Sequence, residues 1–503
     1  MEFAFVFCFF VVGVISALLY FTWFVPKARP RPPGPPSWPI VGSLFYLSKF
    51  PHRSMEELAK KHGPIMSLRL GYMNHIIISN AEMAFEVFKN HDVDFANRPR
   101  NLVIGKYLGF DYSNITFSPY GDHWRLLRKI CATELLTQMR LKSFEHGRQD
   151  EMACMVENIT KHSQGGKVVE MRPIFQQLIS NFICRMLFGK RREKSDNLLG
   201  SSFDEFFNCI LTIVEIVGTF DISDLIPILK PFDLQGFEKR LKPIRKQIEN
   251  SLSNILKEYR KGNKIAAHST TKDFVEILLG LDEKLDEKST MGILTDMIVG
   301  GTDTSAITLE WALTELIRHP KIIKKAQEEL DKVVGRNRQV LESDLPNLPY
   351  LQAIIKENFR LHPAVPLGIP HHNNTDAQIL NYKIPANTTL FVNTWAIGRD
   401  SKVWEKPLEF DPDRFFGSNI NVGGSNYNLL PFGSGRRRCP GADLAQLMVQ
   451  CGLATVLHAF DWSPQPGCKP EDMDIMEAFG TLSQIAKPLV VVAKPRLSPQ
   501  IYK

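Results

Sequence analysis

Cysteine is scarce in this chain, and its spacing excludes two classes of protein. Eight cysteines occur among 503 residues, and no two of them form a CxxC pair. A small disulfide-stabilised scaffold needs many paired cysteines, and a structural zinc site needs closely spaced Cys or His ligands. The chain fits neither class, and its sparse thiols suit a reducing compartment better than a disulfide framework.

A strong excess of charge of one sign is also missing. Lys and Arg total 61 against 54 Asp and Glu, which gives a net charge of +7, and the basic residues are scattered. Nucleic-acid-binding proteins concentrate basic residues in patches, so we expect no nucleic acid partner, whereas an acidic partner surface is compatible with this charge. No complete GxGxxG fingerprint of a dinucleotide site occurs, since Gly433-Ser434-Gly435 lacks the third glycine. We find no internal repeat.

Charge is absent from one long stretch near the N-terminus, residues 3–25. This apolar run is long enough to cross a bilayer as a helix. A cleavable signal would carry a basic region before a shorter apolar stretch, whereas here Glu2 precedes the run and basic residues follow it, at Lys27, Arg29 and Arg31. Residues 1–25 are therefore predicted to form a transmembrane anchor that leaves the main body in the cytosol.

Proline is concentrated directly after this anchor, in Pro30-Arg31-Pro32-Pro33-Gly34-Pro35-Pro36. Prolines impose an extended backbone, so residues 26–45 are predicted to be a semi-rigid hinge that holds the catalytic body off the membrane. A Pro-rich ligand for a recognition domain is the alternative. Residues 46–503 then form the main domain.

Periodicity predicts that this domain is mainly helical with two β-rich patches. Residues 65–70 and 75–79 flank Gly71-Tyr72-Met73-Asn74 and predict a hairpin, and residues 379–394 alternate as strands do. Apolar residues recur at helical spacing in four later segments, which are Asp303–His319, Ile322–Val334, Leu351–Leu361 and Gly441–Phe460.

A glycine- and arginine-rich loop surrounds Cys439, in Pro-Phe-Gly-Ser-Gly-Arg-Arg-Arg-Cys-Pro-Gly at 431–441. Its glycines allow a tight turn and close approach to a flat ligand. Pro440 at a first helical position would aim the positive end of a helix at the sulfur, and both this end and the arginines favour a thiolate. A buried, inert cysteine beside a basic loop is the alternative, but it does not explain the glycines or arginines.

This loop reads FxxGxRxCxG and resembles the haem-binding loop of the cytochrome P450 monooxygenases. The matching positions are Phe432, Gly435, Arg437, Cys439 and Gly441. Three further family motifs occur upstream in the expected order, at Gly300-Gly301-Thr302-Asp303-Thr304-Ser305, Glu357-Asn358-Phe359-Arg360 and Pro407-Leu408-Glu409-Phe410-Asp411-Pro412-Asp413-Arg414-Phe415. The resemblance implies the mainly α P450 fold with small β-sheets, preceded by one transmembrane helix, with heme b as cofactor and Cys439 as the iron ligand.

The glycine pair at 300–301 needs a physical reason, because each glycine inside a helix costs roughly 1 kcal/mol relative to Ala. Missing side chains there would open a groove for dioxygen and water, and the resemblance assigns proton delivery to Asp303 and Thr304. The alternative is an ordinary N-cap, with Thr302 and Asp303 preceding a helix that starts at Ser305.

Family resemblance also assigns architectural and cofactor-binding residues. Glu357, Arg360 and Arg414 are expected to form a buried ion-pair network behind the cysteine loop, although a Glu and Arg three residues apart are often an ordinary surface pair. The remaining cofactor contacts are expected from Trp124, Arg128, Gly300 and His371, besides Phe432, Gly435, Arg437 and Gly441 of the loop. Simple packing is the alternative for Trp124 and Arg128, and His371 rests on little more than its place after Pro370.

The substrate pocket is expected, by family analogy, to be lined by apolar residues from several segments. These are Leu108, Phe110, Met297, Val365 within the 364–369 stretch, and Phe479 and Leu482 within 479–482. None of them is charged, so an apolar or aromatic small substrate is favoured. A second apolar stretch, residues 220–232, is broken by two prolines and either dips into the bilayer surface or packs as ordinary core.

Together these residues predict a haem-thiolate monooxygenase on the endoplasmic reticulum membrane, using O2 and electrons from NADPH through a membrane-bound flavoprotein reductase. The residues within these motifs and the Pro-rich hinge resemble those of plant microsomal hydroxylases of specialised metabolism. A phenylpropanoid, flavonoid or terpenoid substrate is therefore expected. Two alternatives remain at this point: a haem-thiolate isomerase or dehydratase that does not use O2, and a non-enzymatic membrane haem protein.

Overall fold

The computed structural model describes residues 30–191, 209, 213, 221–262, 271–282, 285–480, 482–498 and 500–502. The anchor expected at 1–25 lies outside these residues. Within the described part, no helix combines the length and the apolar character that crossing a bilayer requires.

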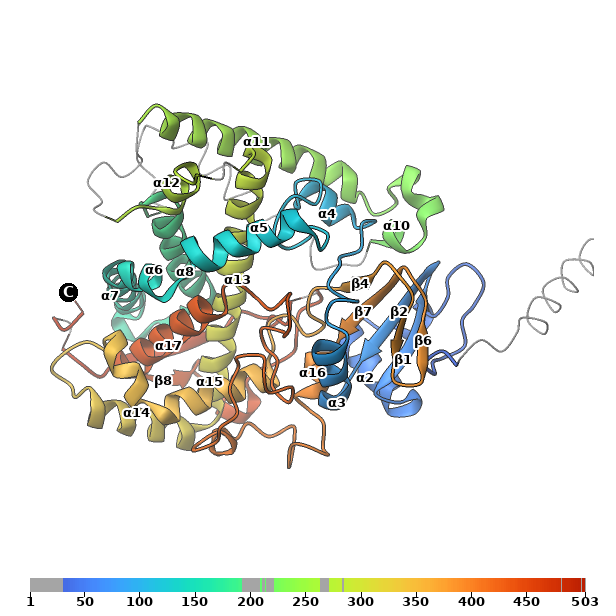
Figure 1. Ribbon diagram of the computed structural model, residues 1–503. Coiled ribbons are helices and arrows are strands. Elements are labelled where there is room, and N and C mark those ends of the chain that lie inside the picture. Colours follow the sequence, from blue (N-terminus) through green and yellow to red (C-terminus); the bar gives the residue numbers. More distant parts are fainter. Residues whose placement is uncertain are drawn as a thin grey trace, which may run out of the picture.

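One long helix, α13 (Glu287–Arg318), runs through the centre of the molecule, and the other long helices pack around it (Figure 1). Asp286 begins α13 by accepting a hydrogen bond from the backbone N–H of Ser289 at 2.9 Å. The helices packed against it or against its neighbours are α7 (Glu145–His162), α8 (Met171–Phe188), α11 (Phe237–Arg260), α12 (Phe274–Leu279), α14 (Pro320–Val333), α15 (Pro349–Leu361) and α17 (Ala442–Ala459).

Shorter helices connect these elements and cover the sheets. They are α2 (Pro51–His62), α3 (Ala81–Phe85), α4 (Val103–Tyr107), α5 (Asp122–Ile130), α6 (Gln138–Ser143), α10 (Ile222–Leu225) and α16 (Thr394–Ile397). Short segments of 3-10 or π geometry occur at η1 (Leu44–Tyr46), η2 (Glu86–Asn90), η3 (Cys131–Leu135), η4 (Gln164–Gly166), η5 (Pro227–Phe232), η6 (Glu342–Asn347), η7 (Pro412–Arg414) and η8 (Pro470–Asp472).

The strands form three small sheets at the side and base of the helical body. The largest has the order β1-β2-β7-β4, with β2 and β7 parallel and the other neighbours antiparallel. Its strands are β1 (Ile65–Leu70), β2 (Met73–Ile78), β4 (His371–Asn373) and β7 (Thr388–Val392). The other sheets are β3-β9-β8, made of Val168–Glu170, Val490–Pro495 and Phe460–Pro464, and β5-β6, made of Ala377–Ile379 and Tyr382–Ile384.

The predicted elements exist, and their boundaries differ most in two places. The expected four-residue hairpin loop is a two-residue turn, because β2 already begins at Met73. The helix expected to start at Asp303 is the second half of α13, which continues without interruption through the glycine pair. An N-cap at Thr302 or Asp303 is therefore excluded.

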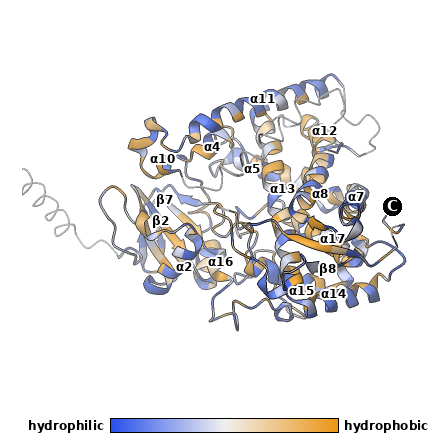
Figure 2. Ribbon diagram, turned by 180° about the vertical axis from the view of Figure 1, so that it is seen from behind, coloured by the Kyte–Doolittle hydropathy of each residue, from blue (hydrophilic) through white to orange (hydrophobic). Residues whose placement is uncertain are grey.

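Apolar residues fill the space between the central helices. Figure 2 shows hydrophobic residues along α8, α13 and α17, whereas the outer helix α11 alternates between hydrophobic and hydrophilic residues. Trp311 of α13 and Phe182 of α8 are almost completely buried. This rigid interior fixes the position of the α13 face that carries the glycine pair.

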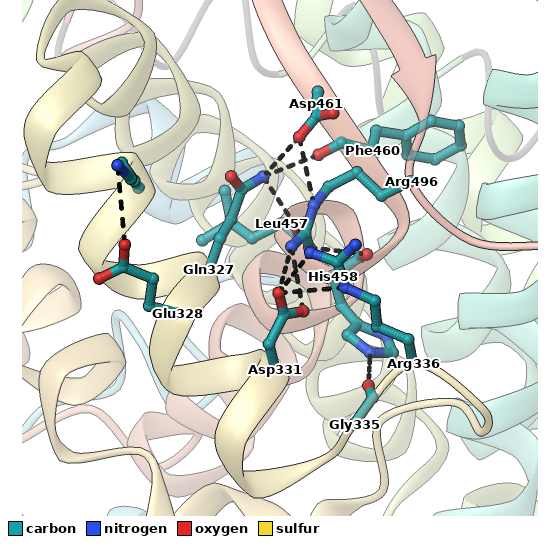
Figure 3. A network of polar contacts seen from close by, with 11 residues as sticks. Gln327, Glu328, Asp331, Gly335, Arg336, Leu457, His458, Phe460, Asp461 and Arg496 are labelled. Atoms are coloured by element: carbon teal, nitrogen blue, oxygen red, sulfur yellow. Dashed lines mark hydrogen bonds and ion pairs between the residues drawn. The ribbon is translucent and has the colours of Figure 1, made fainter.

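A polar network joins the far end of α14 to the β8-β9 sheet (Figure 3). Arg496 contacts Asp331 at 3.0 Å and Asp461 at 3.2 Å, and the amide of Gln327 donates to the carbonyl oxygen of Leu457 at 3.2 Å. These contacts satisfy the backbone carbonyls where α17 ends and β8 begins. The network lies outside the predicted site residues, and its role is structural.

Candidate functional site

The loop before Cys439 is a tight turn held by its own backbone. The amide of Cys439 donates to the carbonyl oxygen of Phe432 at 2.9 Å, and Gly433 and Gly435 have φ of +68° and +66°, which L side chains rarely adopt. The Phe432 ring meets Phe359 of α15 edge-on, with centroids 5.3 Å apart. The sequence prediction of glycine-dependent turns in this loop therefore matches the backbone.

The helix that follows the loop starts later than expected. Gly441 is the N-cap of α17 and Ala442 is its first residue, so Pro440 precedes the cap and does not occupy the first helical position. The helix still presents a positive end to the sulfur, because the Gly441 N–H acts to lower the pKa of the Cys439 thiol.

Several opposing effects act on the pKa of the Cys439 thiol. Burial raises the pKa of the Cys439 thiol and outweighs the opposing effects of the Gly441 N–H and of Arg128 and Arg438. A thiol deprotonates outright when it coordinates a metal. The expected thiolate is therefore the form that Cys439 would take on binding the haem iron.

Three arginines converge beside this loop without an acidic partner. Arg437 donates to the carbonyl oxygens of Ala96 and Ser118, each at 2.6 Å, and Arg98 donates to that of Pro370 at 2.6 Å. Burial, followed by repulsion from Arg128, lowers the pKa of Arg437 to about 9.

Within the described ranges, no carboxylate forms an ion pair with Arg98, Arg128 or Arg437. Buried cations without counter-ions are costly, so this cluster is suited to a ligand that brings negative charge. The two carboxylates of a haem fit it, and the arginines are the residues that would hold them.

Trp124 and His371 lie beside this arginine cluster, and they make different contacts. The indole of Trp124 donates to the carbonyl oxygen of Ile115 at 3.1 Å, and its ring lies 4.4 Å from the Arg437 guanidinium. His371 Nδ1 is 3.1 Å from the carbonyl oxygen of Phe95, and burial lowers the pKa of His371 to about 3. His371 is therefore neutral, and the positive charge of the cluster comes from its arginines.

The two glycines of α13 have different surroundings. A Cβ at Gly300 would meet nothing within 4 Å, whereas a Cβ at Gly301 would lie 3.0 Å from Cδ1 of Ile183 in α8. Gly300 therefore leaves open space, and Gly301 allows α8 to pack closely. The prediction that both missing side chains open a groove applies to Gly300 alone.

Asp303 and Thr304 are neighbours in sequence, and they face different surroundings. Thr304 Oγ1 donates to the Gly300 carbonyl oxygen at 2.8 Å on the open side of the helix. Asp303 accepts from the amide of Gln176 in α8 at 3.0 Å, and burial raises its pKa. Its second oxygen is buried and has no hydrogen-bond partner among the residues that the structure describes. The pair does not share one face, so Asp303 reaches the groove only through intervening groups.

Asp296 is a polar residue of this helix face that the sequence analysis did not single out. It lies two turns before Thr304 and one turn before Gly300 on the helical repeat. Its carboxylate accepts from the Asn114 amide at 2.6 Å and from the Thr116 N–H at 3.1 Å, and burial raises its pKa to about 7. Asp296 thereby ties α13 to the 114–118 segment, whose carbonyls are bound by Arg98, Arg437 and Trp124.

The ExxR pair and Arg414 meet in the interior. Arg360 and Glu357 form two hydrogen bonds of 2.7 Å with no exposed side-chain surface, and Arg414 Nε lies 3.3 Å from Glu357 Oε1. Arg360 also donates to the carbonyl oxygens of Gly398, Pro407 and Glu409. The network thus fixes the position of the irregular segment that leads to the cysteine loop.

A large cavity lies between the four-stranded sheet, α4, α10 and α11. Its free space, open solvent included, is about 1300 Å³, and most of its lining is apolar. Phe479 and the 366–369 part of the 364–369 stretch line it.

The other expected pocket residues lie elsewhere. Leu108 and Phe110 are buried in the main core, Met297 packs against that core, Val365 precedes the lining segment, and Leu482 packs beside Ile307 and Trp311. Sequence analysis missed the polar residues of the cavity wall, among them His75, Asp221 and Asp224. Nothing in their local sequence pattern marks them, because they meet only in the folded chain.

Comparison with known proteins agrees with this geometry. The profile of the family described as Cytochrome P450 matches residues 32–491. A flavonoid 3'-monooxygenase of Arabidopsis thaliana is 40% identical over 480 residues, covering 94% of this chain and 93% of the relative. A flavonoid 3'-monooxygenase of Crocosmia x crocosmiiflora is 39% identical, covering 95% and 94%. A 3,9-dihydroxypterocarpan 6A-monooxygenase of Glycine max is also 39% identical, covering 97% and 98%.

Proposed function

The chain belongs to the cytochrome P450 family, and from that premise we propose that it hydroxylates a flavonoid or related phenolic compound of plant specialised metabolism. The protein is a haem-thiolate monooxygenase that uses dioxygen and electrons from a reductase. When bound, the haem supplies the activation of dioxygen, and Cys439 is the residue that would hold its iron. The carboxylates of the group would meet Arg98, Arg128 and Arg437.

The observation that carries the substrate proposal is the cavity itself. It is large and mostly apolar, and its lining contains several aromatic side chains, among them Phe117, Phe391 and Phe479. Such walls suit a planar ring system. The activities that the relatives' names describe concern flavonoids and a pterocarpan, and they support the same class.

The residues of α13 handle protons in this proposal. The Thr304 hydroxyl stands in the open space beside Gly300 and is both a donor and an acceptor. Burial raises the pKa of Asp303, which favours its protonated form and allows it to donate a proton. Because Asp303 faces α8, protons pass from it to Thr304 through water or through a rotation of the carboxyl group.

We place the protein on the endoplasmic reticulum membrane, anchored by residues 1–25 with the catalytic domain in the cytosol. A group of exposed apolar side chains supports contact with the bilayer near the cavity: Trp38, Ile40, Phe45, Tyr72, Ile228, Phe232 and Leu234. The backbone N–H of Tyr72 donates to Leu225 at 2.9 Å, which joins the β1-β2 turn to the α10 segment. We name this group the apolar face.

Electrons come, in this proposal, from NADPH through a membrane-bound flavoprotein reductase. The basic loop before Cys439 is the side on which an acidic partner would dock, since the Arg436 side chain is exposed there.

Turnover by reconstituted microsomes tests the function. The full-length protein is expressed with a plant NADPH reductase and supplied with a library of flavonoids, other phenylpropanoids and terpenoids. We expect NADPH-dependent formation of a product heavier by one oxygen atom from a flavonoid or a related phenolic. Products from terpenoids alone would contradict the substrate class, and products formed without O2 would contradict the reaction.

A further inference from the structure

The four-stranded sheet presents a histidine to the cavity. Alternate residues of β2 point to opposite faces of the sheet. Ile76 and Ile78 pack into the core on one face, whereas Met73 and His75 line the cavity on the other. Thr389 of β7 is the register partner of His75 and lines the cavity as well. His75 is therefore held in the wall by strand pairing.

The contacts of His75 determine which of its nitrogens carries the proton. Nδ1 lies 3.1 Å from the carbonyl oxygen of Met73, which can only accept, so Nδ1 is the donor. Burial lowers the pKa of His75 to about 4, so the ring is neutral near pH 7. The ring also stacks on Phe391, with centroids 5.9 Å apart and an angle of 10° between the planes. Nε2 is therefore an acceptor, and no donor to it occurs among the residues that the structure describes.

Asp221 supplies a second acceptor on the α10 side of the cavity. It is the N-cap of α10, and its Oδ1 accepts from the Ser223 N–H at 2.8 Å. Its Oδ2 is buried and has no partner in the described part of the chain. Asp224, by contrast, already uses both carboxylate oxygens on the Val103 N–H, at 3.0 and 3.2 Å. An unsatisfied buried oxygen is uncommon, and a donor that enters the cavity would satisfy it.

We propose that His75 and Asp221 recognise aromatic ligands through the ligand's own hydroxyl groups. The ligand donates O–H bonds to His75 Nε2 or Asp221 Oδ2 while its rings occupy the apolar space of the cavity. This inference deepens the proposed function and rests on it for the flavonoid identity of the ligand. It adds a selection rule, because a wall of acceptors binds a phenol and disfavours the corresponding methyl ether, which has no donor.

Equilibrium dialysis of the full-length, haem-loaded protein tests the rule with a matched pair of probes, naphthol and its methyl ether. Both share one ring system, and only naphthol has an O–H donor. We expect the parent to bind naphthol about 3- to 10-fold more tightly, which is the range of one net hydrogen bond. Turnover is not needed for this measurement.

Two variants locate the preference, and a third serves as control. His75→Phe keeps an aromatic ring against Phe391 but removes the acceptor. Asp221→Asn keeps an oxygen for the α10 cap and presents an amide donor in place of Oδ2. We expect each variant to reduce the preference for naphthol by about 2-fold or more, and the double variant to abolish it. Leu367→Val removes one methylene group from the apolar wall and should weaken the binding of both probes equally.

The haem content per protein identifies the variants that fold. If His75→Phe binds little haem, the naphthol preference of Asp221→Asn tests the proposal. Equal binding of the two probes by the parent, binding of neither, or an unchanged preference in the folded variants would each overturn the proposal. A failure of the proposed function is distinguishable: turnover of no flavonoid, together with a naphthol preference that depends on His75 and Asp221, would reject the substrate class and retain the recognition rule.

Discussion

The hydroxyl of Thr304 donates to the carbonyl oxygen of Gly300, one turn earlier in α13, at 2.8 Å. Gly300 has no side chain to cover this bond, and a Cβ there would have no neighbour within 4 Å. The hydroxyl therefore stands at an open surface of an otherwise packed helix, where it can exchange its backbone partner for a bound molecule at little cost. Asp303, the preceding residue, is directed toward Gln176 in α8.

Removal of the Thr304 hydroxyl should uncouple NADPH consumption from product formation. Thr304→Ala deletes a side chain that borders open space, so haem content and substrate affinity should stay near the parent values. Without the hydroxyl, proton delivery is misdirected and reducing equivalents leave as hydrogen peroxide. We expect product per NADPH to fall at least about 10-fold while NADPH consumption continues.

Thr304→Ser is the matched control, since it keeps the hydroxyl and should retain most of the coupling. Coupling in Thr304→Ala equal to that of the parent would show that Thr304 is an ordinary helix residue. Asp303→Asn should instead slow NADPH consumption and product formation together, because it impairs the supply of protons.

The buried network at Glu357 should be needed for folding and haem retention. Glu357→Gln leaves Arg360 and Arg414 without their shared carboxylate, and an unpaired buried charge costs about 3–5 kcal/mol. We expect low haem content per protein and a lower midpoint in urea unfolding. Glu328→Gln is the control, because its pair with Lys324 is exposed and contributes about 0–1 kcal/mol. Similar losses in the two variants would contradict a special role for the network.

The sequence predicted those parts of the site that depend on local pattern. Cys439 and its glycines lie within eleven residues of one another, and the turn at Gly433 and Gly435 follows from their backbone freedom. The helix around Thr304 was likewise predicted from periodicity, although its first half was missed because α13 is buried on most sides and has little polar alternation.

The rest depends on contacts between segments that are distant in sequence. Arg98 joins the cation cluster through Pro370, which lies 272 positions later. Asp296 meets Asn114 across 182 positions, and no periodicity specifies that contact. The burial of Cys439 depends on such contacts as well, because elements outside the loop bury the thiol and raise its pKa, and the loop sequence does not reveal them.

Membrane binding should depend on two separate elements. Deletion of residues 1–25 should weaken sedimentation with anionic liposomes and leave haem incorporation intact, with residual binding from the apolar face. Adding Ile228→Glu and Phe232→Glu should abolish the remaining membrane binding, because the two side chains are 73% and 69% exposed. Met139→Glu is the control, since Met139 is 80% exposed and belongs to α6, outside the apolar face. If Met139→Glu reduced liposome binding as much as the two substitutions in the apolar face, the proposed contact of that face with the bilayer would be rejected.

Asp296 should make stability depend on pH in a direction that its burial determines. Burial raises its pKa in the folded protein to about 7, above the unfolded value of about 3.9. Stability from the protonated carboxyl is therefore fully present below about pH 4 and is lost as the pH rises to about 7. A shift of about three pKa units corresponds to at most roughly 4 kcal/mol.

Asp296→Asn cannot titrate, so it should lose this slope. The altered bond to Thr116 adds an offset in stability that does not change with pH. Urea unfolding of the haem-loaded proteins at several values between about pH 5 and pH 8 measures the difference, and groups that titrate in both proteins cancel. Relative to the parent, the variant should gain stability with rising pH and level off above about pH 7. Asp122→Asn, at a carboxylate that is 98% exposed, should follow the parent. A parent and an Asp296→Asn variant with parallel pH profiles would show that the Asp296 carboxyl is ionised throughout, and the 114–118 segment would then be held to α13 by a charged acceptor.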